Sequence, residues 1–191
     1  LLGNQGPDPL FYSVLVPRLR KFMRLGSVMH SDKPNELLFG LKSSLSILND
    51  QEREVGRAYL FGFLCHYTLD ANMHPLVFFN EYQVCDAGVE DFGRKDGGEV
   101  HAVIESELDE MVLFVKRGET VATFNPARQI LRGSNAVLST ISKMHAYAAM
   151  TAYGEHIPPE MFSSALKSFR RIERFFHSKT GLMREGLGRF E

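Results

Sequence analysis

Hydrophobic residues recur at helical spacing along almost the whole chain. Residues three and four positions apart share one face of a helix, so this period predicts amphipathic helices. No segment shows the sustained apolar–polar alternation that is typical of a strand. The predicted helical segments are 10–24 with a break at Pro17, 36–48, 50–70, 100–116, a short segment from Pro126, 136–153 and 160–176. The pattern therefore predicts an all-α bundle of about six or seven helices.

Capping signals place several helix ends. Asn49 precedes Glu52 by three residues, the spacing of a capping box, and opens the long helix that we expect to reach Asp70. Gly118 and Gly154 follow the last periodic residues of two later helices, which is where glycine commonly ends a helix.

Three further stretches carry specific expectations. Residues 57–70 are apolar nearly all round, which predicts a buried helix. Residues 3–9 are rich in Gly, Pro and Asp, and we expect that they cannot start as a helix. Residues 84–98 carry four glycines among charges and predict a long surface loop.

Composition narrows the class of protein. The 191 residues predict a single domain over 1–191, and the start at Leu1 without a Met predicts further residues upstream. The net charge is −1 and the cations are scattered, so nothing favours a nucleic-acid partner. The one basic cluster, on residues 160–176, is interpreted as a solvated helix face.

Two cysteines without a CxxC motif exclude a disulfide scaffold and a thiolate zinc site. No apolar run approaches the roughly 20 residues of a transmembrane helix. The compartment and the oligomeric state stay open.

Two histidine–carboxylate pairs are the most informative chemistry in the chain. His66 precedes Asp70 by four residues, and His101 precedes Glu105 by four, with His74 in between. On a helix this spacing directs both side chains of a pair to one point, as metal-ligating pairs require. Each pair alone also fits a simple hydrogen-bonded or solvated pair, but their joint occurrence favours a metal centre.

The remaining histidines are less distinctive. His30 is by itself an ordinary residue at a helix end, and Asp8 is by itself a turn residue. His145, His156 and His177 lack nearby spaced carboxylates, and we expect structural roles for them.

The order of these motifs resembles the bacterial zinc-dependent phospholipase C family. The resemblance covers about residues 3–110, and it rests on Gly3-Asn-Gln-Gly-Pro-Asp-Pro-Leu-Phe-Tyr12, Met29-His30, His66-x3-Asp70-x3-His74-Pro75 and His101-x3-Glu105. It implies an all-α fold with a zinc cluster between helices.

The resemblance also implies a ligand set of two or three zinc ions. The first ion would be held by Asp8, His30, His66 and Asp70, and the second by His74, His101 and Glu105. Asp70 would bridge to a third ion, whose other ligands come from the N-terminal segment in this family. No residue before Gly3 fills that role here. The loop before His74 is also shorter than in the family, and we expect His74 just past the helix end, with Pro75 holding the chain extended.

The function implied is an enzyme, a phospholipase C-like phosphodiester hydrolase. Metal-activated hydroxide would attack the phosphorus of a glycerophospholipid or another phosphodiester, with Asp8 as both ligand and proton acceptor. An apolar platform for transient contact with a membrane surface would consist of Phe78, Phe79 and Tyr82. Alternatively, these three side chains would be buried in the hydrophobic core. One alternative is a zinc-dependent nuclease of the same architecture, which Glu105 in place of Asp and the lack of a basic groove disfavour. Another is a non-catalytic metal-binding helical protein.

Overall fold

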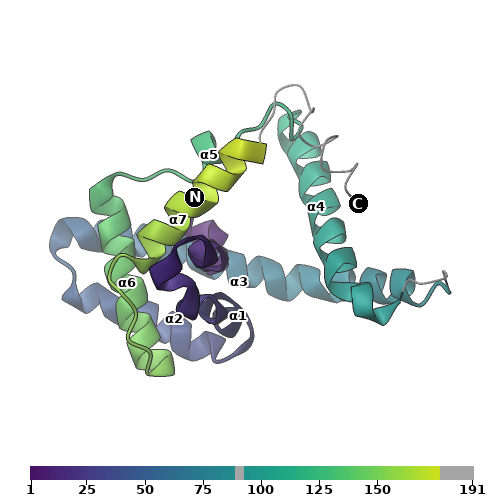
Figure 1. The fold of residues 1–191 in the computed structure, drawn as a ribbon. Helices are drawn as coiled ribbons and strands as arrows, with labels where there is room; N and C mark the ends of the chain where they lie inside the picture. Colours follow the sequence, from purple (N-terminus) through teal and green to yellow (C-terminus); the bar gives the residue numbers. More distant parts are fainter. Residues whose placement is uncertain (89–92, 177–191) are drawn as a thin grey trace. The chain divides into compact units, whose positions relative to one another are not determined.

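The computed structural model describes residues 1–88 and 93–176 as helices and short connections (Figure 1). No strand occurs within these ranges, so the predicted all-α class is confirmed. The α-helices are α1 (Arg24–Ser31), α2 (Pro34–Ser43), α3 (Asp50–Cys85), α4 (Gly97–Arg117), α5 (Pro126–Gln129), α6 (Asn135–Tyr153) and α7 (Met161–Phe176). Short 3-10 helices are η1 (Leu2–Gln5), η2 (Asp8–Leu15), η3 (Pro17–Phe22), η4 (Ser44–Ile47) and η5 (Arg94–Asp96). None of the described helices combines the length and hydrophobicity that crossing a bilayer requires.

The described residues cluster into two compact units. The first unit comprises residues 1–67 with 125–176, and the second comprises 68–88 with 93–124. The chain passes from the first unit to the second within α3. The single domain predicted from chain length stays a prediction.

The first unit holds most of the buried apolar side chains. In this unit α2 packs against α6, and α7 packs against η2, where the Tyr12 and Phe169 rings stack at 4.1 Å. Its largest fully buried residues are Phe63, Phe162, Leu10, Leu19, Met29, Leu37, Leu41, Leu131, Ile141, Met144, Met161 and Leu166. This core fixes η2, α1 and the first half of α3, the three elements that carry the first candidate site.

A buried histidine sits at the centre of this core. The Nε2 atom of His145 lies 2.7 Å from the Tyr59 hydroxyl, and its ring stacks on Phe162 with centroids 4.5 Å apart. Burial lowers the pKa of His145 to about 3, so the ring stays neutral at physiological pH. His145 therefore lies in the core, in keeping with the structural role expected for it. His156 is exposed, and His177 lies outside the described residues.

The burial of His145 predicts a pH-dependent stability. Since the pKa of His145 is lower in the folded chain (about 3) than its ordinary value of 6.5, the unfolded state binds more protons between these values. The free energy of unfolding should therefore fall as the pH drops from about 6.5 towards 3, with a contribution of up to about 1.4 kcal/mol per pH unit. Urea unfolding at several pH values measures the slope. His145→Gln should flatten it, His156→Gln should not, and equal slopes in all three chains would contradict the prediction.

Several helix ends fall where the sequence placed them. The Asn49 and Glu52 capping box is present: the Glu52 amide donates to Asn49 Oδ1 at 2.9 Å, and the Asn49 amide donates to Glu52 Oε2 at 3.2 Å. Gly118 and Gly154 follow α4 and α6 with φ of 63° and 70°, the left-handed conformation that favours glycine.

The extent of α3 differs from the prediction. The helix continues past Asp70 and through Pro75 to Cys85, so His74 lies inside the helix and not in an extended segment. Pro75 removes one backbone donor, a loss that a long helix with a packed partner tolerates. The loop predicted over residues 84–98 is also shorter than expected, because this range includes the end of α3, η5 and the start of α4. Residues 89–92 lie outside the described residues.

Three further expectations are wrong. Residues 3–9 form most of η1 and the start of η2, because the closely spaced Gly and Pro residues are compatible with 3-10 turns. Residues 57–70 are not buried all round: Tyr59 and Phe63 are buried, but Phe61 is 70% exposed. Phe78, Phe79 and Tyr82 are 41%, 60% and 43% exposed, so the alternative that they form a buried core does not hold.

The second unit has a small core. Its described buried apolar residues are Val77, Cys85 and Val100, from the second half of α3 and the start of α4. Arg94 adds a bidentate ion pair to Asp86, with N–O distances of 2.8 and 2.6 Å. Polar contacts, such as this one between η5 and the residue after α3, therefore carry more weight here than in the first unit.

Candidate metal centres

Six of the seven predicted ligands come together as two groups. Asp8, His30 and His66 form the first group, and His74, His101 and Glu105 form the second. Within each group one nitrogen or oxygen atom from every residue lies within 4.8 Å of the others. Each group lies inside one unit. Among the described residues no further set of three such side chains meets this spacing.

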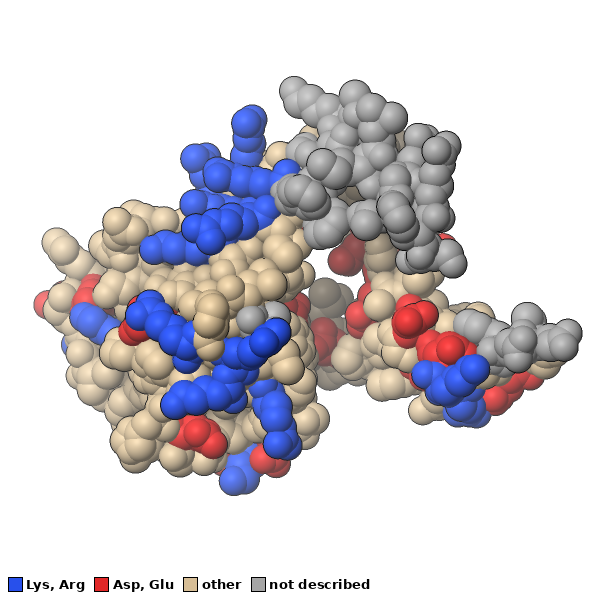
Figure 2. All heavy atoms as spheres, in the orientation of Figure 1, with Lys and Arg blue, Asp and Glu red and all other residues tan. Residues whose placement is uncertain are grey.

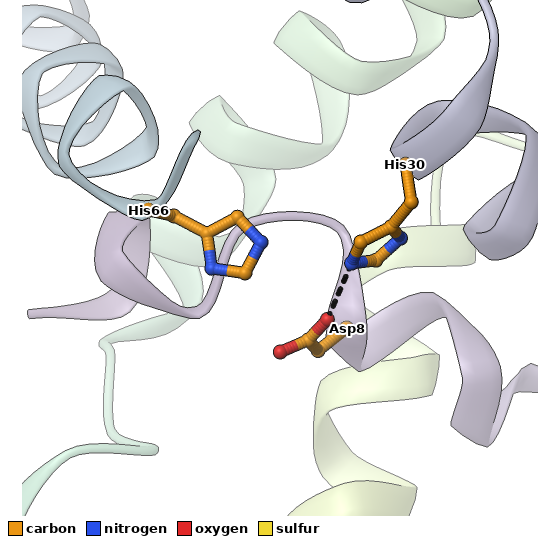
Figure 3. Close-up of side chains that lie close together, drawn as sticks. All are labelled: Asp8, His30 and His66. Atoms are coloured by element: carbon orange, nitrogen blue, oxygen red, sulfur yellow. Dashed lines mark ion pairs between the residues drawn. The ribbon is translucent and has the colours of Figure 1, made fainter. Parts of the chain in front are cut away.

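The first group joins three elements of the first unit. Asp8 opens η2, His30 lies in the last turn of α1, and His66 is a largely buried residue of α3. Figure 3 shows the two histidine rings on either side of the Asp8 carboxylate. His30 Nε2 lies 2.8 Å from Asp8 Oδ1, and His30 Nδ1 lies 2.8 Å from the Gly26 carbonyl oxygen. A proton on Nδ1 is donated to that carbonyl, which directs the Nε2 lone pair towards Asp8. In the neutral ring two acceptors then face each other, an arrangement that a bound cation satisfies, whereas the protonated ring donates to Asp8 itself.

Two glycines allow the Asp8 segment to approach α3. Gly6 has φ of 49°, and a Cβ atom there would lie 2.1 Å from His66 Cδ2. A Cβ atom on Gly3 would lie 2.2 Å from the Tyr59 carbonyl oxygen. Neither overlap is sterically allowed, so the first group depends on glycine at these positions. From the sequence, Gly3 and Gly6 indicated only that residues 3–9 would not start a helix.

The second group joins α3 and α4 within the second unit. His74 Nε2 lies 3.2 Å from Glu105 Oε1, and His101 Nε2 lies 3.3 Å from the same oxygen. Ligand atoms about 2.0–2.1 Å from a tetrahedral zinc ion are about 3.3 Å apart. These two distances are compatible with ligands on one metal ion and equally with hydrogen bonds to Glu105. The Glu105 side chain is 46% exposed, which leaves access from solvent.

Glu81 is a functional candidate that sequence reasoning missed. Its Oε2 atom lies 2.9 Å from His101 Nδ1, and its side chain is only 13% exposed. A Cβ atom on Gly97 would lie 2.7 Å from Glu81 Oε1, so glycine makes room for this carboxylate. Metal-ligating histidines commonly donate their second N–H to a carboxylate, and His101 has this partner. The spacing of seven residues from His74, two turns of one helix face, is the signal that would have found it.

A further acidic residue lies beside the second group. Asp109 follows Glu105 by one helical turn on α4, and burial, together with the charge of Glu105, raises the pKa of the Asp109 carboxyl. Desolvation of the carboxyl is the larger cause, and repulsion by the Glu105 charge is the smaller one. A cation bound at the second group would offset the repulsion by Glu105.

Asp70 is not brought into either group. It lies one turn after His66 in α3 but clusters with the second unit. Its predicted roles, as a fourth ligand of the first ion and as a bridge to a third, stay predictions.

Comparisons with known proteins add no relative: a scan of protein-family models, a search of curated proteins and a search of solved structures each found no match. The resemblance to zinc-dependent phospholipases C therefore rests on the motif order alone.

Proposed function

We propose that this chain is a zinc-dependent phosphodiester hydrolase with glycerophospholipids as its substrate class. The observation that supports the proposal is the pair of ligand groups, each with two histidine nitrogens and one carboxylate oxygen. Three protein ligands per ion leave a position for water or substrate, the arrangement of catalytic rather than structural zinc. The substrate class comes from the family resemblance.

The donor set determines what the residues would do. Asp8, His30 and His66 would hold one ion, and His74, His101 and Glu105 a second. A bound zinc ion supplies Lewis-acid polarisation of a phosphoryl oxygen and a more acidic water. Asp8 has one oxygen directed at His30, and its second oxygen points away from that ring (Figure 3). This second oxygen would accept the proton of the attacking water. Glu81 would hold the His101 ring in its ligating orientation.

One observation favours a nuclease as the second candidate. Lys167, Arg170, Arg171 and Arg174 recur at i, i+3, i+4 and i+7 on α7, which places them on one helix face. Such a stripe suits a polyanion such as single-stranded nucleic acid.

Metal content tests the proposal first. Elemental mass spectrometry on the chain, purified without chelator or histidine tag, should find about two zinc ions per chain. Hydrolysis of phosphatidylcholine and of single-stranded DNA by the same preparation then separates the two candidate activities. No metal, and no uptake of added zinc, would overturn both.

His66→Ala is expected to remove one zinc ion and to lower phosphodiester hydrolysis by more than about 100-fold. Losing a direct ligand should cost at least as much as losing an outer partner, which typically costs 10–100-fold. Metal analysis and initial rates measure both effects. The matched control is His156→Ala, an exposed histidine outside both groups, which should keep its metal and its rate. Full activity in His66→Ala would contradict the model.

A further inference from the structure

The two units carry opposite charge. The residues of the first unit include 15 Lys and Arg against 9 Asp and Glu, whereas residues 68–124 include 4 against 12. The net charge of −1 for the whole chain conceals this division. An excess of positive charge on one unit attracts anionic partners even when the whole chain is almost neutral.

Much of this positive charge lies on the outer face of α7. Lys167, Arg171 and Arg174 are exposed, Arg170 is half-buried, and Figure 2 shows Lys and Arg gathered over this helix. The opposite face of α7 is buried through Met161, Phe162, Ala165 and Leu166. None of the four cations forms an ion pair with another residue in the described ranges.

Glu173 does not neutralise this stripe. Its carboxyl is half-buried, burial raises its pKa, and its charge acts on Tyr12 of η2, so it belongs to the face of α7 that packs inward. The sequence alone suggested a mixed, solvated face. In the structure Glu173 is half-buried, whereas Lys167, Arg171 and Arg174 are exposed.

A second basic segment follows the element that packs on α7. After η2, which stacks on α7 through Tyr12 and Phe169, come the exposed cations Arg20, Lys21 and Arg24. Exposed apolar side chains accompany them: Met23, between Lys21 and Arg24, is 41% exposed, and the preceding Phe11 and Leu15 are 39% and 50% exposed. Exposed apolar residues among cations are the composition of surfaces that sit at a lipid headgroup boundary.

We propose that the basic face of the first unit, defined as Lys167, Arg170, Arg171 and Arg174 of α7 with Arg20, Lys21 and Arg24, binds anionic lipid bilayers. Clustered Lys and Arg attract acidic headgroups, and Leu15 and Met23 offer apolar insertion that a nucleic acid would not use. The proposal does not depend on hydrolysis, because neither metal group contributes to it.

Sedimentation with vesicles tests this proposal on the full chain. We expect binding to vesicles of mixed phosphatidylcholine and phosphatidylserine, little binding to phosphatidylcholine alone, and weakening as salt shortens the range of the attraction. R171Q/R174Q should lower partitioning by about 30-fold, on the basis of about fivefold per cation. The matched control is K42Q/R57Q, which removes two exposed cations from the groove between α2 and α3, and it should bind almost as the parent chain does.

The outcomes distinguish this proposal from the proposed function. Equal binding to both vesicle types, or equal losses in the two double variants with helical content preserved by circular dichroism, would overturn it. Binding of single-stranded DNA that R171Q/R174Q abolishes, without vesicle binding, would assign the face to nucleic acid. Metal content and hydrolysis, measured separately on the same preparations, report on the proposed function alone.

Discussion

Replacing Gly6 with alanine is expected to empty the first ligand group while the second stays loaded. The added Cβ atom would lie 2.1 Å from the His66 ring and 2.4 Å from its Nε2 atom, so either the ring or the Asp8 segment must move. A displacement of this size separates the ligands of Asp8, His30 and His66 by more than zinc coordination allows. Metal analysis should show a loss of one ion per chain, with phosphodiester hydrolysis falling by more than about 100-fold.

Gly118→Ala provides the matched control for Gly6→Ala. Gly118 has φ of 63°, close to that of Gly6, but a Cβ atom there would meet nothing within 4 Å. Its ψ of 18° lies in the left-handed helical region, whereas the ψ of −137° at Gly6 does not. Gly118→Ala therefore introduces a positive-φ alanine, at a cost of about 1 kcal/mol, without the steric overlap. Loss of metal in both variants would attribute the effect to general destabilisation. Full metal content in Gly6→Ala would contradict the arrangement of the first group.

Glu81→Gln is expected to lower the zinc affinity of the second group by about 10–100-fold. Glutamine keeps the size of the side chain and still accepts a hydrogen bond from His101 Nδ1, but it loses the negative charge that makes the ring a stronger ligand. Competition titration with a chromophoric chelator measures the affinity. Glu107→Gln, an exposed glutamate on α4 outside both groups, should leave it unchanged.

A second measurement separates this role from general packing. Because the second unit has few buried apolar residues, a metal held by His74, His101 and Glu105 should also clamp α3 to α4. Zinc should therefore slow amide hydrogen exchange in α4, and Glu81→Gln should require more zinc for the same protection. Equal affinity in the two chains, or exchange that does not respond to zinc, would show that Glu81 has no positioning role.

The sequence predicted the helical architecture well where local chemistry decides it. The reciprocal bonds of Asn49 and Glu52 and the left-handed Gly118 and Gly154 act over one helical turn, so their signals need no tertiary information. The same holds for His101 and Glu105, whose spacing of four residues is set by the helix itself.

The errors arose where long-range packing decides the outcome. Pro75 suggested a helix end after Asp70, but the apolar Val77 and Cys85 continue a helix face that is buried, which keeps α3 intact. That continuation is also what brings Glu81 to His101, a pairing that sequence spacing around His101 could not suggest. Asp70 falls in the second unit, and its predicted role as a ligand beside His66 stays a prediction.

The unequal distribution of charge has a practical consequence for handling the protein. A chain with a cationic unit and an anionic unit offers each molecule a complementary surface on its neighbours. Attraction of this kind is strongest in dilute buffer and fades as salt shortens the Debye length to about 8 Å at physiological ionic strength. Near its isoelectric point of about 6.7 the protein should therefore self-associate at low salt, disperse as salt is added, and be retained by both cation and anion exchangers.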